Sequence, residues 1–216
     1  MIELALSAAA QRITEIPWVE RYGGISRPVK IPLQGAQDVP IYRTYPIRQG
    51  ISDSECYQQN GYLELVPDER YLNLTYMEVL RPMAEVTGQT YGNFQFRGRV
   101  RLVFWLNLPK MGVHIDNIVG YAGIAARDII AALSGDGPDN AGGRYMYSNF
   151  SVLTSDMSVF SRYDYGPDAD ALMLYPFDFG AVDFDVDYLF SQNCVSPLAV
   201  GAPIECVQEW KFSAPT

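Results

Sequence analysis

The chain has 216 residues, of which 48% are hydrophobic, 19% charged and 13% aromatic, a composition typical of a folded protein and unlike that of a disordered chain. A formal net charge of −9 argues against a protein that grips the phosphate backbone of a nucleic acid, since that requires a basic surface. No apolar run approaches the ~18–20 residues that cross a bilayer, and the N-terminus lacks the basic start of a signal peptide, so we expect a soluble protein made in the cytoplasm, with no membrane partner.

The first predicted element is an amphipathic helix over residues 1–16. Its apolar residues recur at spacings of three and four, which places them on one face of a helix. They are Ile2, Leu6, Ala9, Ala10, Ile13 and Ile16. Pro17 follows directly, and the residue before a proline disfavours helical backbone, so the helix must end there.

A proline-rich segment follows from Gly23 to Gly50. Its prolines interrupt short β-prone pieces and are Pro28, Pro32, Pro40 and Pro46. Because proline cannot donate to a ladder of backbone hydrogen bonds, these pieces suit edge strands and connecting arms better than a central strand. We expect extended, irregular chain here.

Residues 62–66 and 71–80 both alternate between apolar and polar side chains, as strands with one buried face do. Between them lie Pro67, Asp68, Glu69 and Arg70, a composition typical of a turn. The two segments are therefore predicted to form a β-hairpin.

The clearest strand covers residues 94–108. Its alternate apolar residues face one way. They are Phe94, Phe96, Val100, Leu102, Phe104, Leu106 and Leu108. The opposite side carries Arg97, Arg99 and Arg101, so we expect a core strand with a basic face.

A second helix is predicted from about residue 117 to 134. Its apolar seam consists of Ile118, Ala122, Ala125, Ile129 and Leu133. Asp116 is suited to the N-cap and Gly135 to the end of the last turn, because these residue types satisfy or relax the backbone at helix termini.

The last third of the chain supplies an arm, a strand and a tail. Residues of about 135–170 are polar, rich in tyrosine and too numerous for a tight connection, so we predict a β-rich inserted arm. A strand at about 179–190 closes the core, and about 191–216 forms an extended, proline-containing C-terminal tail. The chain, 1–216, is thus expected to be a single α+β domain: a mixed or antiparallel β-sheet with two main helices, about 1–16 and 117–134, packed on it.

Three acids occupy alternate positions within residues 180–190, namely Asp183, Asp185 and Asp187. A calcium loop counted from the first of them would need glycine sixth and an acid twelfth, where the chain has Tyr188 and Cys194. A strand explains the pattern better, because its period of two puts the acids on one face and their apolar neighbours on the other. We predict an acidic strand face, with a metal site as the less favoured alternative.

The basic and acidic faces suggest a pairing. Opposite charges directly across two strands contribute about 0.2–1 kcal/mol each, which helps to set strand register. We therefore predict that strands 94–108 and 179–190 pair, either within one chain or across a subunit boundary. The alternative is two unrelated solvated faces.

Other residues with catalytic or metal-binding chemistry are isolated in the sequence. His114, the only histidine, lies in a loop, and any nucleophile–histidine arrangement would have to include it. The cysteines, which lack C-x-x-C spacing, are Cys56, Cys194 and Cys206. Acids beside glycines, as turns favour, are Asp136, Asp139, Asp164, Asp168 and Asp170. We predict no catalytic residue, no metal or cofactor site and no enzymatic activity.

The order helix, strands, long strand, helix, strand resembles the α+β core of the tail terminator (tail-completion) proteins of long-tailed bacteriophages. Three segments carry the resemblance, over about half of the chain. They are ALSAAAQRITEIPWVERYGG, FRGRVRLVFWLNL with NIVGYAGIAARDIIAALSG, and AVDFDVDYLF. The likeness is one of topology, and the proline-rich segment 23–50, the arm and the tail depart from it.

The resemblance implies a ring of identical subunits, usually six, that caps the tail tube, stops its polymerisation and joins it to the head. The protein would then reside in the tail or neck of the virion, as a homohexamer whose partners are tail tube and head–tail connector proteins. DNA would pass without specific binding. An acidic strand facing the channel would repel the duplex within a Debye length of ~8 Å.

Three alternatives stay open. Another neck or connector protein of a phage is the nearest one. A carboxylate-dependent hydrolase could use Asp183 and Asp185, since acids two apart on a strand lie ~6.5–7 Å from each other, a separation that glycosidases use. A monomeric binding module with tyrosine-rich arms is the third.

Overall fold

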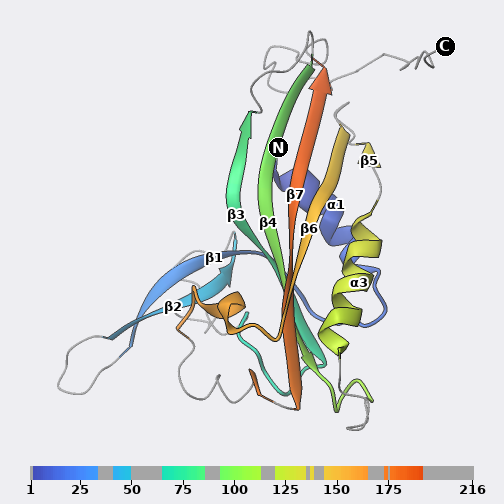
Figure 1. The fold of residues 1–216 in the computed structure, drawn as a ribbon. Coiled ribbons are helices and arrows are strands. Elements are labelled where there is room, and N and C mark those ends of the chain that lie inside the picture. The colour runs from blue at the N-terminus through green and yellow to red at the C-terminus, as the bar shows by residue number, and fades with distance from the viewer. Residues whose placement is uncertain are drawn as a thin grey trace.

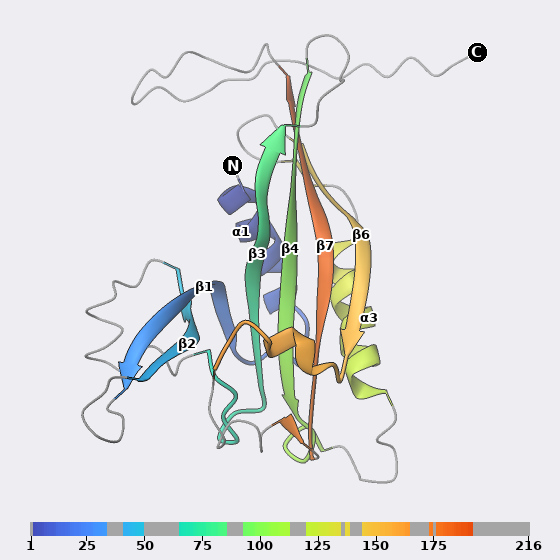
Figure 2. The ribbon, with the colours of Figure 1, turned by 60° about the vertical axis from the view of Figure 1, so that its left-hand side comes forward.

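The computed structural model of the chain describes residues 2–33, 41–49, 65–85, 93–112, 120–134, 137–138, 144–164, 173–174 and 176–191. Within them, two α-helices, α1 (Ile2–Thr14) and α3 (Tyr121–Leu133), pack on one face of a mixed β-sheet (Figure 1). A 3-10 helix, η4 (Met157–Phe160), lies on the opposite face (Figure 2). The arrangement confirms the expected α+β class.

Seven strands of the described residues form one sheet in the order β2-β1-β3-β4-β7-β6-β5. They are β1 (Tyr22–Leu33), β2 (Ile41–Arg48), β3 (Asn73–Glu85), β4 (Asn93–Asn107), β5 (Gly137–Pro138), β6 (Arg144–Thr154) and β7 (Phe177–Ser191). The pair β1–β3 is parallel and the other neighbours are antiparallel.

The first core lies between the helices and the sheet. From α1 and α3 it takes the periodic apolar residues, so the two predicted seams are confirmed where the structure describes them. The buried members are Ala5, Leu6, Ala9 and Ile13 of α1, and Ala122, Ala125, Ala126, Ile129 and Leu133 of α3. From β4 and β7 it takes alternate residues such as Val100, Leu102, Phe184 and Val186, which are fully buried.

Helix α3 begins later than expected. Its N-cap is Gly120, whose φ of 104° no helix can continue, and Asp116 and Ile118 lie outside the described residues. The first turn is instead satisfied from a distance, because the Ala122 N–H donates to Asp178 Oδ2 on β7 at 2.9 Å. A sheet residue therefore fixes where the helix starts.

A second core, which the sequence did not predict, lies on the other face of the sheet. Beyond Arg101 the outward-facing positions of β4 become apolar, with Val103 and Trp105 buried. Tyr45 and Ile47 of β2 and Phe160 of η4 cover them. The same face of β4 is therefore basic up to Arg101 and apolar beyond it.

The hairpin predicted for residues 62–66 with 71–80 falls partly outside the described residues, since 62–64 are not among them, and the described residues do not form it. Strand β3 is flanked by β1 and β4, and the edge that such a hairpin would use is taken by the Arg21 carbonyl, which accepts the Thr75 N–H at 2.9 Å. Leu65 is instead a buried turn residue of the second core. Alternation predicted the strand but not its partner.

Two segments differ from expectation: the described part of the proline-rich segment 23–50 is not irregular, and part of the expected insertion at about 135–170 belongs to the main sheet. The proline-rich segment forms β1 and β2, a hairpin paired from Ser26↔Arg48 to Leu33↔Ile41 that projects from the sheet (Figures 1 and 2). Strand β6, expected within the inserted arm, pairs with β7 from Arg144↔Leu189 to Thr154↔Gly180 and so belongs to the main sheet.

Candidate functional site

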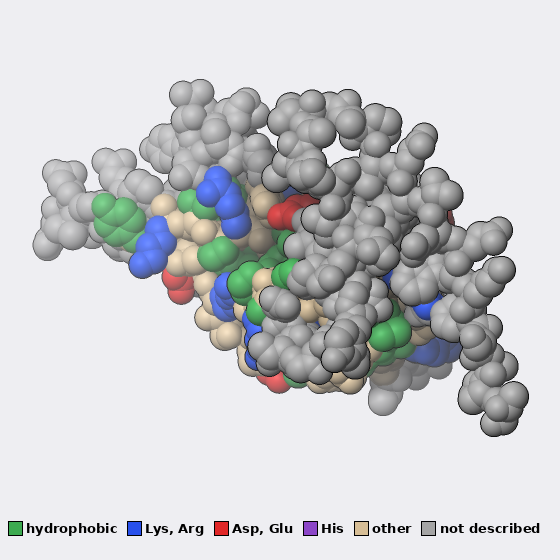
Figure 3. All heavy atoms as spheres, turned by 90° about the horizontal axis from the view of Figure 1, so that it is seen from above, with side chains coloured by type: hydrophobic (Ala, Val, Ile, Leu, Met, Phe, Trp, Pro, Cys, Tyr) green, Lys and Arg blue, Asp and Glu red, His purple; other side chains and the backbone are tan. Residues whose placement is uncertain are grey.

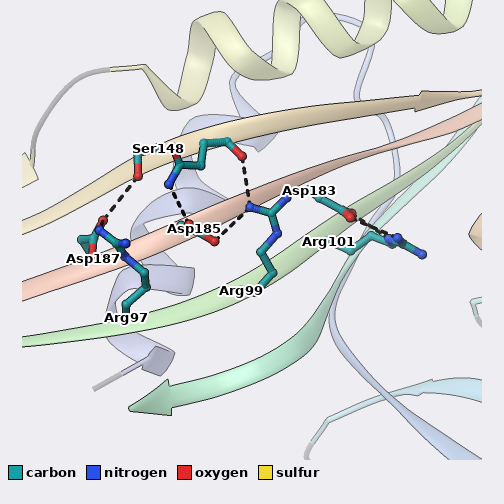
Figure 4. Close-up of polar contacts among 8 residues, drawn as sticks. Arg97, Arg99, Arg101, Ser148, Asp183, Asp185 and Asp187 are labelled. Atoms are coloured by element: carbon teal, nitrogen blue, oxygen red, sulfur yellow. Dashed lines mark hydrogen bonds and ion pairs between the residues drawn. The ribbon is translucent and has the colours of Figure 1, made fainter. Parts of the chain in front are cut away.

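The predicted pairing of the basic and acidic strands is confirmed, and it occurs within one chain. The register of β4 and β7 places Arg97 opposite Asp187, Arg99 opposite Asp185 and Arg101 opposite Asp183 (Figure 4). These six residues are called the ladder below. The alternative of two unrelated solvated faces is wrong, because each arginine bonds to the aspartate across from it.

Two rungs of the ladder are bidentate. Arg97 reaches the two oxygens of Asp187 through Nε at 2.7 Å and Nη2 at 3.1 Å. Arg101 holds Asp183 in the same way, at 2.7 and 3.0 Å. The parallel N–H groups of a guanidinium match a carboxylate in this geometry, which adds direction to the charge attraction.

The middle rung uses one arginine nitrogen and recruits β6. Arg99 Nη1 lies 2.9 Å from Asp185 Oδ1 and also donates to the Asn149 carbonyl at 3.1 Å. Asn149 Nδ2 donates to the other oxygen of Asp185 at 2.8 Å. Asn149 has a left-handed φ of 52° at the irregularity in the β6–β7 register, so this bulge aims its side chain at the ladder.

The aspartates share one face of β7, as predicted, but they do not form a solvated acidic surface. Their side chains are 0% exposed at Asp187, 13% at Asp183 and 15% at Asp185. Asp187 also accepts from Gln95 Nε2 at 2.8 Å and from Ser148 Oγ at 3.3 Å. The acids are compensated by arginines and amides at close range.

The electrostatics agree with stable ion pairs. Burial acts to raise the pKa of Asp185, but the hydrogen bonds from Asn149 and Arg99 outweigh it and the pKa is lowered overall. The hydrogen bond with Asp187 raises the pKa of Arg97, and that with Asp183 raises the pKa of Arg101. These hydrogen bonds thus favour the charged forms of Asp185, Arg97 and Arg101.

A second charged site lies next to the ladder, around Glu78 of β3. Its side chain is almost fully buried, and its register partner on β4 is Arg101. The Tyr163 hydroxyl donates to Glu78 Oε1, and Arg162 Nη1 lies 3.4 Å from Oε2. Burial raises the pKa of Glu78, against the opposing effect of Tyr163 and Arg162.

The segment that covers Glu78, residues 155–164, is called the strap. It crosses in front of β4 and β3 between the end of β6 and the β1–β2 hairpin (Figure 2). Asp156 caps η4 by accepting from the Ser158 N–H at 2.8 Å. At its far end the Asp164 N–H donates to the Thr44 carbonyl at 2.8 Å, and the Thr44 N–H donates to Asp164 Oδ2 at 3.3 Å.

Sequence reasoning missed Glu78, although a signal was present. The residue shares the apolar phase of β3 with Leu74 and Tyr76, so alternation places a carboxylate among buried side chains. An acid at such a position needs a partner, because an unpaired buried charge is strongly unfavourable. The identity of that partner, Tyr163, could not be read from the sequence.

Several predicted positions fall outside the described residues: His114, Cys56, Cys194, Cys206, Asp136, Asp139, Asp168 and Asp170. Among the residues that the structure does describe, no three His, Cys, Asp or Glu side chains are grouped so as to hold a metal ion, and no helix has the length and apolarity to cross a bilayer. No protein-family model matches the chain, and no curated protein matches it significantly.

Proposed function

We propose that the chain is a structural protein of a phage virion, a ring-forming tail terminator that caps the tail tube and takes part in joining it to the head. The proposal rests first on the resemblance in element order. The fold supports it with an opening helix and a strand-to-helix unit that pack together, and with the late strand paired in the middle of the sheet.

Within the structure, the observation that carries the proposal of a ring is the projecting hairpin, which lies in the segment 23–50 that departs from the family resemblance. Strand β1 pairs with β3 only between Tyr22 and Ser26, whereas beyond Ser26 it pairs with β2 alone. Residues 22–33 and 41–49 are called the arm from here on, in place of the inserted arm expected at about 135–170. The part of this arm beyond Ser26 extends from the body of the sheet (Figures 1 and 2). An arm that fits a different surface on a neighbour makes a heterologous contact, and such contacts generate rings when their rotation closes.

The ladder changes how DNA passage is explained. Repulsion by an uncompensated acidic strand no longer applies, because each aspartate is paired with an arginine. A channel wall of paired charges would neither attract nor repel the duplex strongly, and the net charge of −9 disfavours its retention. In this proposal DNA passes through the ring without being bound by it.

Another neck or connector protein is the nearest alternative, since an arm suits any ring in that region. A hydrolase built on Asp183 and Asp185 is less favoured. A general acid requires a raised pKa, whereas the pKa of Asp185 is lowered and both carboxylates are bound by arginines.

The test is the native mass of the purified chain, with negative-stain images of the same sample. We expect a closed ring of about six copies. We also expect this ring to bind the end of a tube assembled from the tail tube protein of the same phage. A chain that stays monomeric at high concentration and leaves tube length unchanged when added to polymerising tube protein would contradict the proposal.

A further inference from the structure

The arm is a basic element in an acidic chain. Of the 16 Lys and Arg residues it holds Arg27, Lys30, Arg43 and Arg48, and none of the 25 Asp and Glu residues lies in its two described strands. The surface seen from above shows Lys and Arg side chains beside an apolar one, with an acidic side chain next to them, at the end where the arm lies (Figure 3). Such segregation of charge marks a surface suited to an acidic partner.

The register separates the two faces of the arm. Val29, Tyr45 and Ile47 share one face and pack into the second core. The other, called the outer face, carries the exposed Pro28, Lys30, Tyr42 and Arg48, together with the buried Ser26 and Pro46. Lys30 and Arg48 are therefore the cations of the outer face, whereas Arg27 and Arg43 share the face of Tyr45 and Ile47. Tyr42 is 61% exposed, and tyrosine and arginine are both residue types enriched in protein interfaces.

The edges of the arm are poorly suited to strand addition. Thr44 directs both its N–H and its carbonyl outward to Asp164, so alternate residues of β2, and their partners on β1, also direct their backbone groups outward. Three of these positions are Pro28, Pro32 and Pro46, which have no N–H to offer. A partner is therefore contacted through side chains and not by extension of the sheet.

The arm is held in place before any partner arrives. Tyr45 and Ile47 are buried in the second core, the Gln49 N–H donates to the Ile25 carbonyl at 2.6 Å, and Thr44 is bonded to the strap. A rigid element loses little conformational entropy on binding, so its contacts convert more fully into affinity.

We propose that the outer face of the arm docks on the acidic body of a neighbouring copy of this chain, in a head-to-tail contact. This inference rests on the proposed ring. Contact between two arms would bring like charges together, whereas all 25 acidic residues lie outside the described strands of the arm. Nucleic acid is a less suitable partner, because the whole chain repels it at long range.

The experiment compares two matched double variants of the full chain. Lys30→Glu with Tyr42→Ser reverses one of the two positive charges of the outer face and removes its exposed aromatic ring. Arg81→Glu with Leu174→Ser is the control, since Arg81 and Leu174 are exposed outside the arm and the change in net charge is the same. Circular dichroism and thermal melting establish that both variants fold.

Self-association is measured by sedimentation equilibrium at low and high salt. We expect the arm variant to associate at least about tenfold more weakly than the wild type, the control to match the wild type, and added salt to weaken the wild type most. If both variants form the same ring with wild-type affinity, the arm is not the contact, while the proposed function stands. If the wild type is monomeric at every concentration, this inference fails, and the proposed function fails with it only when the chain also leaves tube length unchanged.

The rival partner is tested with the same variants. The affinity for a duplex DNA of random sequence is measured by fluorescence anisotropy. We expect the wild type and the arm variant to bind this DNA equally weakly. Tight, salt-dependent binding of DNA by the wild type, lost in the arm variant while self-association is unchanged, would assign the arm to nucleic acid and overturn the inference.

Discussion

The ladder and the Glu78 site lie on the same face of the same sheet, yet the pKa of a carboxyl group is shifted in opposite directions in the two. In the ladder, arginines and amides hold the pKa of Asp185 below its ordinary value. At Glu78, burial under the strap raises the pKa. Arg101 lies between the two, across from Asp183 on one side and from Glu78 on the other. The segments and side chains that surround an acid, and not its position on this sheet face, therefore decide whether its pKa is raised or lowered.

The largest expected effect is at the most buried rung. Asp187→Ala removes the acceptor of Arg97, Gln95 and Ser148 at once and leaves polar groups without a partner in a half-buried site. We expect a loss of about 2–4 kcal/mol in the free energy of unfolding, measured by urea denaturation. Asp185→Ala, in a more exposed rung, serves as the comparison and is expected to lose less. Equal losses would mean that the contribution of these ion pairs to stability does not depend on how deeply the aspartate is buried.

The second effect concerns the tyrosine that covers Glu78. Tyr163→Phe keeps the ring in the second core but removes the hydroxyl that donates to the buried carboxylate. We expect a loss of about 1–3 kcal/mol at neutral pH, measured by the same denaturation. In Glu78→Gln the same Tyr163 change should be milder, because a neutral amide needs the donor less. A loss that is identical in both backgrounds would contradict a direct contact.

The two sites are expected to respond to pH with opposite sign. The folded pKa of Glu78 is raised above 4.5, so its contribution is fully present below that value and is lost as pH rises through the folded pKa. The folded pKa of Asp185 is lowered below 3.8, so its contribution is present above that value and is lost as pH falls through the folded pKa. Unfolding free energies of Glu78→Gln and Asp185→Asn between about pH 3 and 8 measure both.

The outcome is read from differences to the wild type. The advantage of the wild type over Glu78→Gln should grow as pH falls, and its advantage over Asp185→Asn should shrink. Parallel pH dependences in the two variants would show that one environment governs both acids.

The smallest effect is the coupling within the middle rung. Arg99 and Asp185 share one direct bond at 2.9 Å, and both side chains are partly exposed. A double-mutant cycle with Arg99→Ala and Asp185→Ala should give a coupling of about 0.5–1 kcal/mol, reduced by salt. Arg127, whose bond to Asp128 lies on the exposed surface of α3, gives the reference for a pair that contributes almost nothing.

Sequence periodicity determined much of the fold and of the ladder. A spacing of two between arginines in one strand and between aspartates in another can be satisfied residue by residue when the strands pair, so the charges indicated that β4 and β7 are neighbours. The antiparallel direction, the register and the pairing within one chain came from the structure. The helical seams were likewise readable, because the spacing of apolar residues fixes which side of a helix is buried.

Only the tertiary structure decided what covers each face. Alternation says which side chains share a side of a strand, but Val103 and Glu78 are buried because the strap and the arm, distant in sequence, fold over them. The prolines of the arm marked an edge without revealing that it projects, since that depends on where β3 stops pairing with β1. Local pattern fixes orientation, whereas burial depends on contacts between segments whose separation along the chain leaves no local trace.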